Sequence, residues 1–215
     1  MSSKHDIAQQ ADISFLEAHM KPRRIQRIRQ VAESRQRGLA IIMEDVWNPH
    51  NLAAIARSAD AFGIQHIHYT TAEEYFDPTQ IGKVSSSGAN KWIDFHYHED
   101  IADCIEALQR DGWLVAATVM TPEARSIYEV DWPQYEQVAV LMGNEHAGLS
   151  ERAIEMADMH IIIPMRGMVQ SFNVSVATAI TISEITRQRD ISEKDFRLSQ
   201  AEAQTLYETF IRKAY

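Results

Sequence analysis

The chain has 215 residues, of which 45% are hydrophobic and 24% charged, and its formal net charge at pH 7 is −9. This length is sufficient for one sizeable hydrophobic core and a small appendage. No run of about 18 uncharged apolar residues occurs, and the N-terminus lacks the apolar stretch of a secretory signal, so we expect a cytoplasmic protein with no membrane partner.

The first element that the sequence predicts is a basic helix over residues 12–36 with an apolar stripe between its arginines. Residues 19–38 hold seven cations and one carboxylate, a local charge of +6 that leaves −15 for the rest of the chain. Such a helix can contact phosphates while the acidic body repels them elsewhere. A solvated helix face is the competing interpretation. The cations are Lys21, Arg23, Arg24, Arg27, Arg29, Arg35 and Arg37.

Predicted strands and helices alternate along the rest of the chain. We expect strands over residues 39–44, 64–70, 92–98, 113–120, 137–142 and 158–164. We expect helices over residues 51–62, 101–112, 151–157, 173–188 and 198–213. Asn51 is predicted to cap the first of these helices and Gly63 to end it. The single cysteine, Cys104, is expected to be buried in the second helix, and one cysteine excludes an internal disulfide and a zinc site built from cysteines.

This alternation of apolar strands with helices predicts an α/β fold, with a mainly parallel sheet covered by helices on both faces. In such sheets, ligands bind beyond the carboxyl ends of the strands. Three unusually polar loops lie at that edge, over residues 45–51, 143–149 and 164–172. The sequence therefore predicts a site there.

Several common site motifs are missing from the sequence. Neither G-x-G-x-x-G after the first strand nor G-x-x-x-x-G-K-[ST] occurs, which argues against a dinucleotide-binding Rossmann site and a P-loop. The residues before Ser171 do not match the G-x-S-x-G elbow of hydrolases. His66 with His68, or His96 with His98, share one side of a strand as metal ligands would. Without a convincing third ligand, we expect exposed strand histidines and no metal.

Three segments resemble the motifs of one family, the SpoU/TrmH branch of the SPOUT methyltransferases. The segment N-P-H-N-L-A-A-I-A-R-S-A-D-A-F-G (48–63) resembles the first motif of this family. The second resembles L-M-G-N-E-H-A-G-L-S (141–150), and the third resembles I-I-I-P-M-R-G-M-V-Q-S-F-N-V-S-V-A (161–177). The three occur in the order and spacing of the family, and the resemblance covers roughly residues 39–188.

The resemblance implies a fold, a cofactor and a partner subunit. It implies a deep trefoil knot in the C-terminal part, although connection rules make knots rare. It also implies a homodimer whose site is completed across a two-fold interface, and S-adenosylmethionine held bent by the loops after three strands. Carried over to this sequence, the cofactor contacts are Thr118, Gly143, Asn144, Ile163 and Phe172. Phe172 departs from the leucine that is common in the family.

For the chemistry, the resemblance implies a polar set made of Asn51, Arg57, Glu145, Ser171 and Asn173. Arg57 lies in a largely apolar helix, where an unpaired cation would be costly. Because arginine stays protonated, we expect it to position an RNA phosphate and the ribose hydroxyl while the phosphate assists proton removal. Glu145 is expected to order its loop and Asn173 rather than accept a proton. Helix capping is the alternative role for Asn51, Ser171 and Asn173, and a surface residue without function is the alternative for Arg57 and Glu145.

The function implied by the resemblance is 2′-O-ribose methylation of tRNA, at guanosine 18 of the D-loop. Arg23, Arg24, Arg27 and His50 are expected to contact the RNA, although phosphate contacts position RNA without specifying a base, and His50 can equally be a loop histidine without a role. The alternatives are methylation at another tRNA position or of rRNA, and a non-catalytic RNA-binding protein of the same fold.

The relatives of rRNA type often carry a separate N-terminal RNA-binding domain, for which this chain is short. Relatives that act at the wobble position tend to lack a long basic N-terminal extension. The expected organisation is a basic helical extension over residues 1–38, a catalytic domain over 39–190 and a C-terminal helix over 191–215.

Overall fold

The computed structural model describes residues 8–46, 48–71 and 88–215. It divides into two compact units, one formed by Gly38–Phe196 and the other by Met1–Arg37 with Arg197–Tyr215. The first seven residues of the expected basic extension lie outside the described residues. Because Arg197–Tyr215 is grouped with Met1–Arg37, the C-terminal helix belongs to the same unit as the basic extension. No helix of the described residues is long and apolar enough to cross a membrane.

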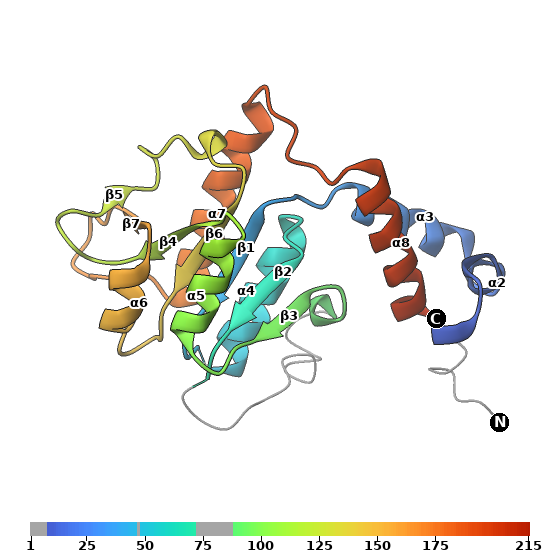
Figure 1. Ribbon diagram of the computed structural model, residues 1–215, viewed down its shortest axis with the longest axis horizontal. Helices are drawn as coiled ribbons and strands as arrows, with labels where there is room; N and C mark the ends of the chain where they lie inside the picture. Colours follow the sequence, from blue (N-terminus) through green and yellow to red (C-terminus); the bar gives the residue numbers. More distant parts are fainter. Residues whose placement is uncertain (1–7, 47, 72–87) are drawn as a thin grey trace. The chain divides into compact units, whose positions relative to one another are not determined.

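The larger unit contains a parallel β-sheet, as the alternating elements predict. Its strands are β1 Leu39–Met43, β2 His66–Tyr69, β3 Asp94–Tyr97, β4 Leu114–Thr118, β5 Arg125–Ser126, β6 Val138–Met142 and β7 Met159–Ile162. Among the described residues these seven strands are ordered β3-β2-β1-β6-β4-β7-β5, and every neighbouring pair is parallel (Figure 1). The fully buried strands β1 and β6 pair at the middle of the sheet.

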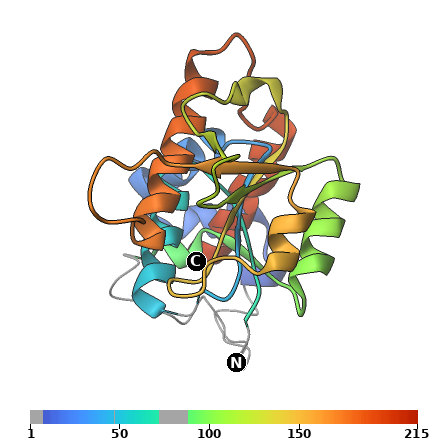
Figure 2. The ribbon, with the colours of Figure 1, turned by 90° about the vertical axis from the view of Figure 1, so that its left-hand side faces the viewer.

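Helices cover both faces of this sheet. The elements are α4 Pro49–Ala61, α5 Ile101–Arg110, α6 Glu151–Met156 and α7 Val174–Ile191, with short 3-10 helices η2 Ala89–Lys91 and η3 Trp132–Gln134. Helices α4 and α7 pack on one face, and α5 and α6 pack on the other (Figure 2). Side chains of β1 alternate between the two layers, since Ile41 packs in the first and Ile42 in the second. Full burial of one such side chain contributes roughly 1.5–3 kcal/mol, so both layers stabilise the sheet.

Two predicted helix boundaries were wrong, and proline is the physical reason in both cases. The helix expected over residues 12–36 is broken into α2 Ile13–Ala18 and α3 Pro22–Glu33. Pro22 has no N–H to donate, which suits the first position of a new helix but not a helix interior. In the same way Pro49 begins α4, so the cap of that helix is Asn48 and not Asn51. Gly63, with φ of +73°, follows the end of α4 as predicted.

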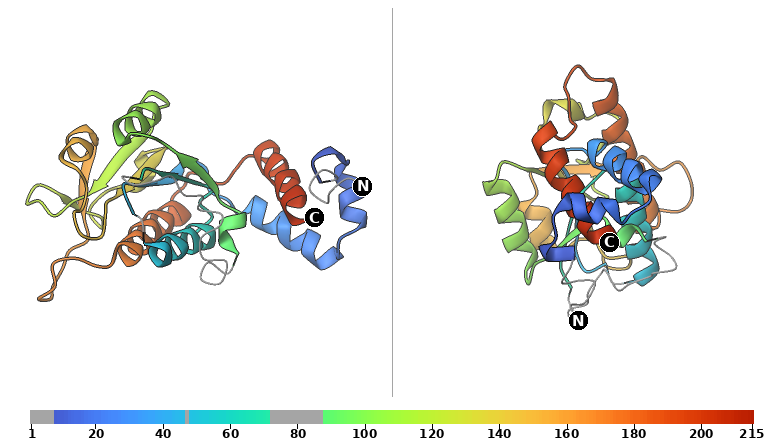
Figure 3. Two further views of the ribbon diagram at one scale, coloured as in Figure 1. Left: turned by 90° about the horizontal axis from the view of Figure 1, so that it is seen from below. Right: turned by 90° about the vertical axis from the view of Figure 1, so that its right-hand side faces the viewer.

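In the smaller unit, α8 Gln200–Ala214 packs against α3 and α2 (Figure 3). Two arginines of the basic segment, residues 19–38, pack against aromatic rings of α8. The Arg29 guanidinium lies 3.9 Å from the centroid of the Tyr207 ring, and the fully buried Arg35 lies 5.5 Å from the Phe210 ring centroid. Such contacts between a cation and an aromatic face stabilise the helix pair. These two arginines therefore help to hold the unit together.

Candidate functional site

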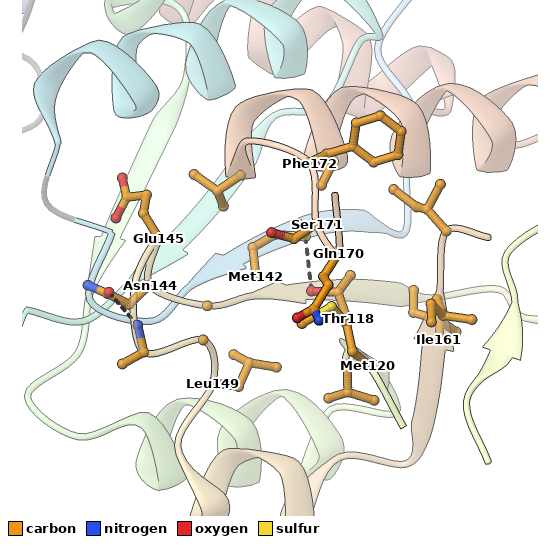
Figure 4. A pocket seen from close by; sticks show the side chains of 18 of the residues that line it. Thr118, Met120, Met142, Asn144, Glu145, Leu149, Ile161, Gln170, Ser171 and Phe172 are labelled. Atoms are coloured by element: carbon orange, nitrogen blue, oxygen red, sulfur yellow. Dashed lines mark hydrogen bonds between the residues drawn. The ribbon is translucent and has the colours of Figure 1, made fainter. Parts of the chain in front are cut away.

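A pocket of about 650 Å³ opens beside the carboxyl ends of β4, β6 and β7. Its wall is formed mainly by the loops that follow β6 and β7 and by the start of α7. Figure 4 shows Asn144 and Glu145 at one end of the pocket and Ile161 at the other, with Thr118 and Met142 between them. Eight of the ten residues predicted for catalysis and cofactor binding line it, namely Thr118, Gly143, Asn144, Glu145, Ile163, Ser171, Phe172 and Asn173.

The loop after β6 is closed on itself by backbone and side-chain hydrogen bonds. The backbone N–H groups of Asn144 and Gly148 each donate to the carbonyl of the other, at 3.0 Å. The Asn144 side chain accepts from the N–H of His146 at 2.8 Å and of Ala147 at 3.1 Å. A Cβ at Gly143 would lie 2.4 Å from the Gly148 carbonyl carbon, so only glycine fits there. The loop is thus a preformed wall of the pocket.

The loop after β1 is fastened to this wall. Asn144 donates from Nδ2 to the carbonyl oxygen of Asp45 at 2.8 Å. The buried carboxylate of Glu44 accepts from the backbone N–H of Ser150 at 2.8 Å and from its hydroxyl at 2.6 Å. Sequence reasoning missed the role of Glu44 and Ser150, although a carboxylate that ends an apolar strand was a signal, because a buried charge needs partners.

A chain of hydrogen bonds links two residues that line the pocket, Glu145 and Asn173, through Asn51, which does not line it. Glu145 accepts from Asn51 Nδ2 at 2.7 Å, and Asn51 accepts on Oδ1 from Asn173 Nδ2 at 3.1 Å. The structure therefore corrects the expectation that Asn51 caps a helix, because its side chain is buried and bonded on both sides. Glu145 orders Asn173 through Asn51 rather than by direct contact.

The remaining pocket residues differ in how their side chains are used. Asn173 is the cap of α7 and accepts from the N–H of Ser175 at 2.9 Å, so the predicted capping alternative describes Asn173 and not Ser171. Ser171 is exposed in the loop before it. The Thr118 hydroxyl donates to the Leu141 carbonyl at 3.0 Å, within the sheet. Phe172 is 40% exposed and so keeps an open ring face beside the pocket.

Arg57 is not brought into this pocket. It is exposed on α4 and makes no hydrogen bond or ion pair within the described part of the chain. The expectation that this cation lies in apolar surroundings is therefore wrong, since Arg57 is exposed on a helix that buries other residues, such as Leu52 and Ile55. His50, in the first turn of α4, is also exposed and outside the pocket.

The residues predicted to bind RNA in the basic segment belong to the smaller unit. Arg23, Arg24 and Arg27 are exposed on α3. Within the described residues they have no hydrogen-bond or ion-pair partner, in contrast to Arg29, which reaches Gln204 and Glu17. These three guanidinium groups are therefore available to an external anion.

The four strand histidines lie together, but three of them are half-buried rather than exposed as predicted. His66 Nδ1 lies 3.0 Å from His96 Nε2, and His68 Nδ1 lies 3.0 Å from His98 Nε2. Burial, helped by the neighbouring histidines, lowers the pKa of His68 to about 3. Cys104 is buried in α5 as expected, and burial raises the pKa of its thiol to about 12.

Comparison with known proteins was consistent with these motifs. Residues 38–183 match the model of the SpoU rRNA Methylase family. A tRNA (guanosine(18)-2′-O)-methyltransferase of Escherichia coli (strain K12) is 36% identical over 193 residues, which are 87% of this chain and 81% of that protein. A solved structure of an A. aeolicus TrmH/SpoU tRNA modifying enzyme aligns with a TM-score of 0.81 and 32% identity, covering 93% of this chain and 98% of that one.

The structure of an AdoMet-bound rRNA methyltransferase from Sinorhizobium meliloti is also similar. It aligns with a TM-score of 0.64 and 28% identity, covering 74% of this chain and 59% of that chain.

Proposed function

The chain belongs to the SpoU rRNA Methylase family, and from this membership we propose that it transfers a methyl group from S-adenosylmethionine to the 2′-hydroxyl of guanosine 18 in tRNA. The observation that carries the proposal is that the loops after β4, β6 and β7 converge on one pocket, and that the bonds Glu145–Asn51–Asn173 tie the start of α4 to two of its lining residues. A tRNA substrate would also require the enzyme to work in the cytoplasm.

The residues of the pocket fit this cofactor. Its volume of about 650 Å³ lies within the range of small-molecule sites. Met142, Leu149 and Ile161 offer an apolar surface for the adenine ring, and Asn144 and Glu145 offer polar groups at one end. When bound, S-adenosylmethionine supplies a methyl group made electrophilic by its sulfonium.

We assign cofactor contacts to the residues that line this pocket. Backbone groups of Thr118, Gly143, Asn144 and Ile163 would hold the cofactor, since they lie where adjacent parallel strands end. Phe172, in place of the leucine common in the family, would cover the adenine with its exposed ring.

The choice of tRNA over rRNA rests on the similarity to tRNA-modifying enzymes and on local charge. The chain covers 98% of the A. aeolicus tRNA modifying enzyme but only 59% of the S. meliloti rRNA methyltransferase. The exposed Arg23, Arg24 and Arg27 offer phosphate contacts on the smaller unit. Methylation at another tRNA position, methylation of rRNA, and RNA binding without methyl transfer are the alternatives that a methylation assay separates.

In the proposed reaction, the polar residues position the ribose hydroxyl and stabilise the charge that develops on it. Glu145 accepts a hydrogen bond from Asn51, and Asn51 accepts one from Asn173, so the Asn173 side chain is held beside the pocket, and Ser171 precedes it in the loop that lines the pocket. Arg57 would bind an RNA phosphate next to the target ribose, and that phosphate would accept the hydroxyl proton. The arginine itself stays protonated throughout.

We further propose that the enzyme is a homodimer in which Arg57 of a second copy completes the pocket. Arg57 is exposed and outside the pocket of its own chain. The loop before α7 and its first turn carry exposed apolar side chains, which a protein partner would cover: Met168, Val169 and Val176. The family resemblance also implies a trefoil knot in the C-terminal part, and the proposal includes this knot.

The test is methylation of an unmodified tRNA transcript by the purified full chain with S-adenosylmethionine labelled in its methyl group. We expect one label per tRNA at guanosine 18, and none on a transcript with 2′-deoxyguanosine at that position. Label at another nucleotide, or on rRNA alone, would show that guanosine 18 of tRNA is not the substrate. RNA binding without any transfer would refute the enzymatic function.

A further inference from the structure

On the sheet face covered by α5, the strands β2 and β3 carry polar side chains, whereas the neighbouring strands β1, β6 and β4 carry apolar ones. On the face covered by α5, the strands β1, β4 and β6 present small or aliphatic residues such as Ile42, Ala117 and Leu141. The strands β2 and β3 are paired in register, with His68 beside His96. Four histidines form a column of imidazoles on this same face. His66 and His68 belong to β2, His96 belongs to β3, and His98 directly follows β3. Polar groups in half-buried positions are costly unless they have partners.

The inner end of this column meets the cysteine of α5. His68 and His98 are hydrogen-bonded through Nδ1 and Nε2 at 3.0 Å, and their rings stack with centroids 5.2 Å apart. Ligand atoms of His68, His98 and Cys104 all lie within 4.8 Å of one another. The third ligand that the sequence did not reveal is therefore supplied by a helix packed over the two strands.

We propose that His68, His98 and Cys104 form a binding site for a borderline-soft divalent metal ion, with Zn²⁺ as the best match and water in the fourth position. Two imidazole nitrogens and one thiolate are ligands that zinc prefers, in tetrahedral geometry. On binding, the metal replaces the proton of the Cys104 thiol, which passes to solvent as the metal–sulfur bond forms. The imidazole that donates the His68–His98 hydrogen bond shifts its N–H to its other ring nitrogen, so that both facing nitrogens can bind the metal.

The distances are compatible with this site after a small adjustment. Tetrahedral zinc separates two ligand nitrogens by roughly 3.3 Å and a nitrogen from a sulfur by roughly 3.6 Å, from bonds of about 2.0–2.1 and 2.3 Å. The two imidazole nitrogens at 3.0 Å are already near this separation. Closing the group from 4.8 Å requires a shift of about 1 Å, which side-chain rotation supplies.

A metal here would join β2, the end of β3 and α5 at one edge of the larger unit. None of the three ligands lines the pocket assigned to methyl transfer. The inference therefore stands apart from the proposed function. It predicts a stabilising site whose loss leaves the pocket intact.

The experiment uses the full chain, freed of metal with a chelator and titrated with Co²⁺. Because Cys104 is the single cysteine of the sequence, a thiolate-to-cobalt charge-transfer band identifies it without ambiguity. We expect that band together with the strong visible absorption of four-coordinate cobalt, saturating at one ion per chain and bleached by Zn²⁺. Weak absorption of six-coordinate cobalt, with no sulfur band, would overturn the proposal.

Variants define the ligand set. Cys104→Ser and His98→Ala should each abolish the sulfur band or weaken Co²⁺ binding more than roughly tenfold, since even residues outside the first coordination shell change metal affinity by that factor. His66→Ala is the matched control, because this histidine lies in the same column but outside the three ligands, and it should keep the band. Equal loss in His66→Ala would overturn the assignment.

X-ray absorption of the zinc-loaded wild-type protein decides the question even if Cys104→Ser does not fold. We expect one sulfur at about 2.3 Å with nitrogen ligands at about 2.0–2.1 Å. A coordination shell of nitrogen and oxygen alone would refute the site.

Discussion

Glu145 and Asn51 are 94 residues apart in the sequence, and the carboxylate of the first accepts a 2.7 Å hydrogen bond from the side-chain amide of the second. Asn51 passes this constraint to Asn173, another 122 residues along the chain from Asn51. An amide that both donates and accepts cannot rotate by half a turn without losing both bonds. Glu145 therefore fixes the orientation of Asn51, and through it that of Asn173, which lines the pocket.

Replacing Glu145 with alanine should disorder this arrangement. The Asn51 amide is buried and would lose its acceptor, which costs about 1–3 kcal/mol of folding stability. We expect methyl transfer to fall at least roughly tenfold, because a difference of about 1.4 kcal/mol in transition-state positioning has that effect. Single-turnover rates and thermal unfolding measure the two effects. Glu155→Ala is the control, since this glutamate is exposed on α6 and away from the pocket, and a rate loss there as large would contradict the role of Glu145.

Arg57→Lys should abolish turnover while cofactor binding survives. Lysine keeps the charge but cannot hold a phosphate and a hydroxyl with the fixed fork of a guanidinium. Arg57 is exposed and lies outside the pocket of its own chain, and in the proposed site it binds an RNA phosphate rather than the cofactor, so the fold and the cofactor affinity should not change. Calorimetric titration with S-adenosylmethionine and a methyl-transfer assay measure both quantities. Retained turnover would remove Arg57 from the mechanism.

Mixing two inactive variants tests whether Arg57 acts across subunits. If the site combines Arg57 of one chain with Asn173 of the other, then a dimer of Arg57→Ala with Asn173→Ala has one intact site. An equal mixture after exchange of subunits should recover about a quarter of wild-type activity, because half of the dimers are mixed and each has one working site of two. No recovery in verified mixed dimers would show that each chain uses its own Arg57.

Gly143→Ala should damage the pocket wall. The added Cβ would stand 2.4 Å from both the Gly148 carbonyl carbon and the Leu149 nitrogen. Overpacking of this kind costs about 1–3 kcal/mol, so we expect cofactor affinity to fall roughly tenfold or more. Gly167→Ala is the matched control, because a Cβ there has no neighbour within 4 Å among the described residues. Equal affinities of the two variants would refute the preformed wall.

Changing Arg23, Arg24 and Arg27 together to glutamine should weaken tRNA binding and its dependence on salt. Removing one arginine–phosphate interaction should lower the slope of log affinity against log salt by about 0.7–0.9, and removing all three should lower it by about 2–3. Cofactor affinity should not change. Arg110→Gln is the control, because Arg110 is an exposed arginine at the end of α5. An unchanged slope in the triple variant would exclude this surface from RNA binding.

The sequence by itself determined the local parts of this protein. The apolar runs 39–44 and 137–142 predicted buried strands, which the structure places at Leu39–Met43 and Val138–Met142. The cluster of arginines marked the basic segment. Both signals are properties of neighbouring residues. The three motif loops were also visible in the sequence. Seven predicted residues of the second and third motif segments, together with Thr118, line one pocket, because parallel strands bring their carboxyl ends to a common edge.

Only the tertiary structure decided which of these residues touch. The insertion of β6 between β1 and β4 brings the loops after β1 and β6 together and so pairs Asn51 with Glu145. The packing of α8 on α3 turns Arg29 and Arg35 from candidate phosphate ligands into structural contacts. The packing of α5 on β2 and β3 brings Cys104 to two histidines. Strand order and helix packing arise from contacts between distant segments, and no local pattern of residues encodes them.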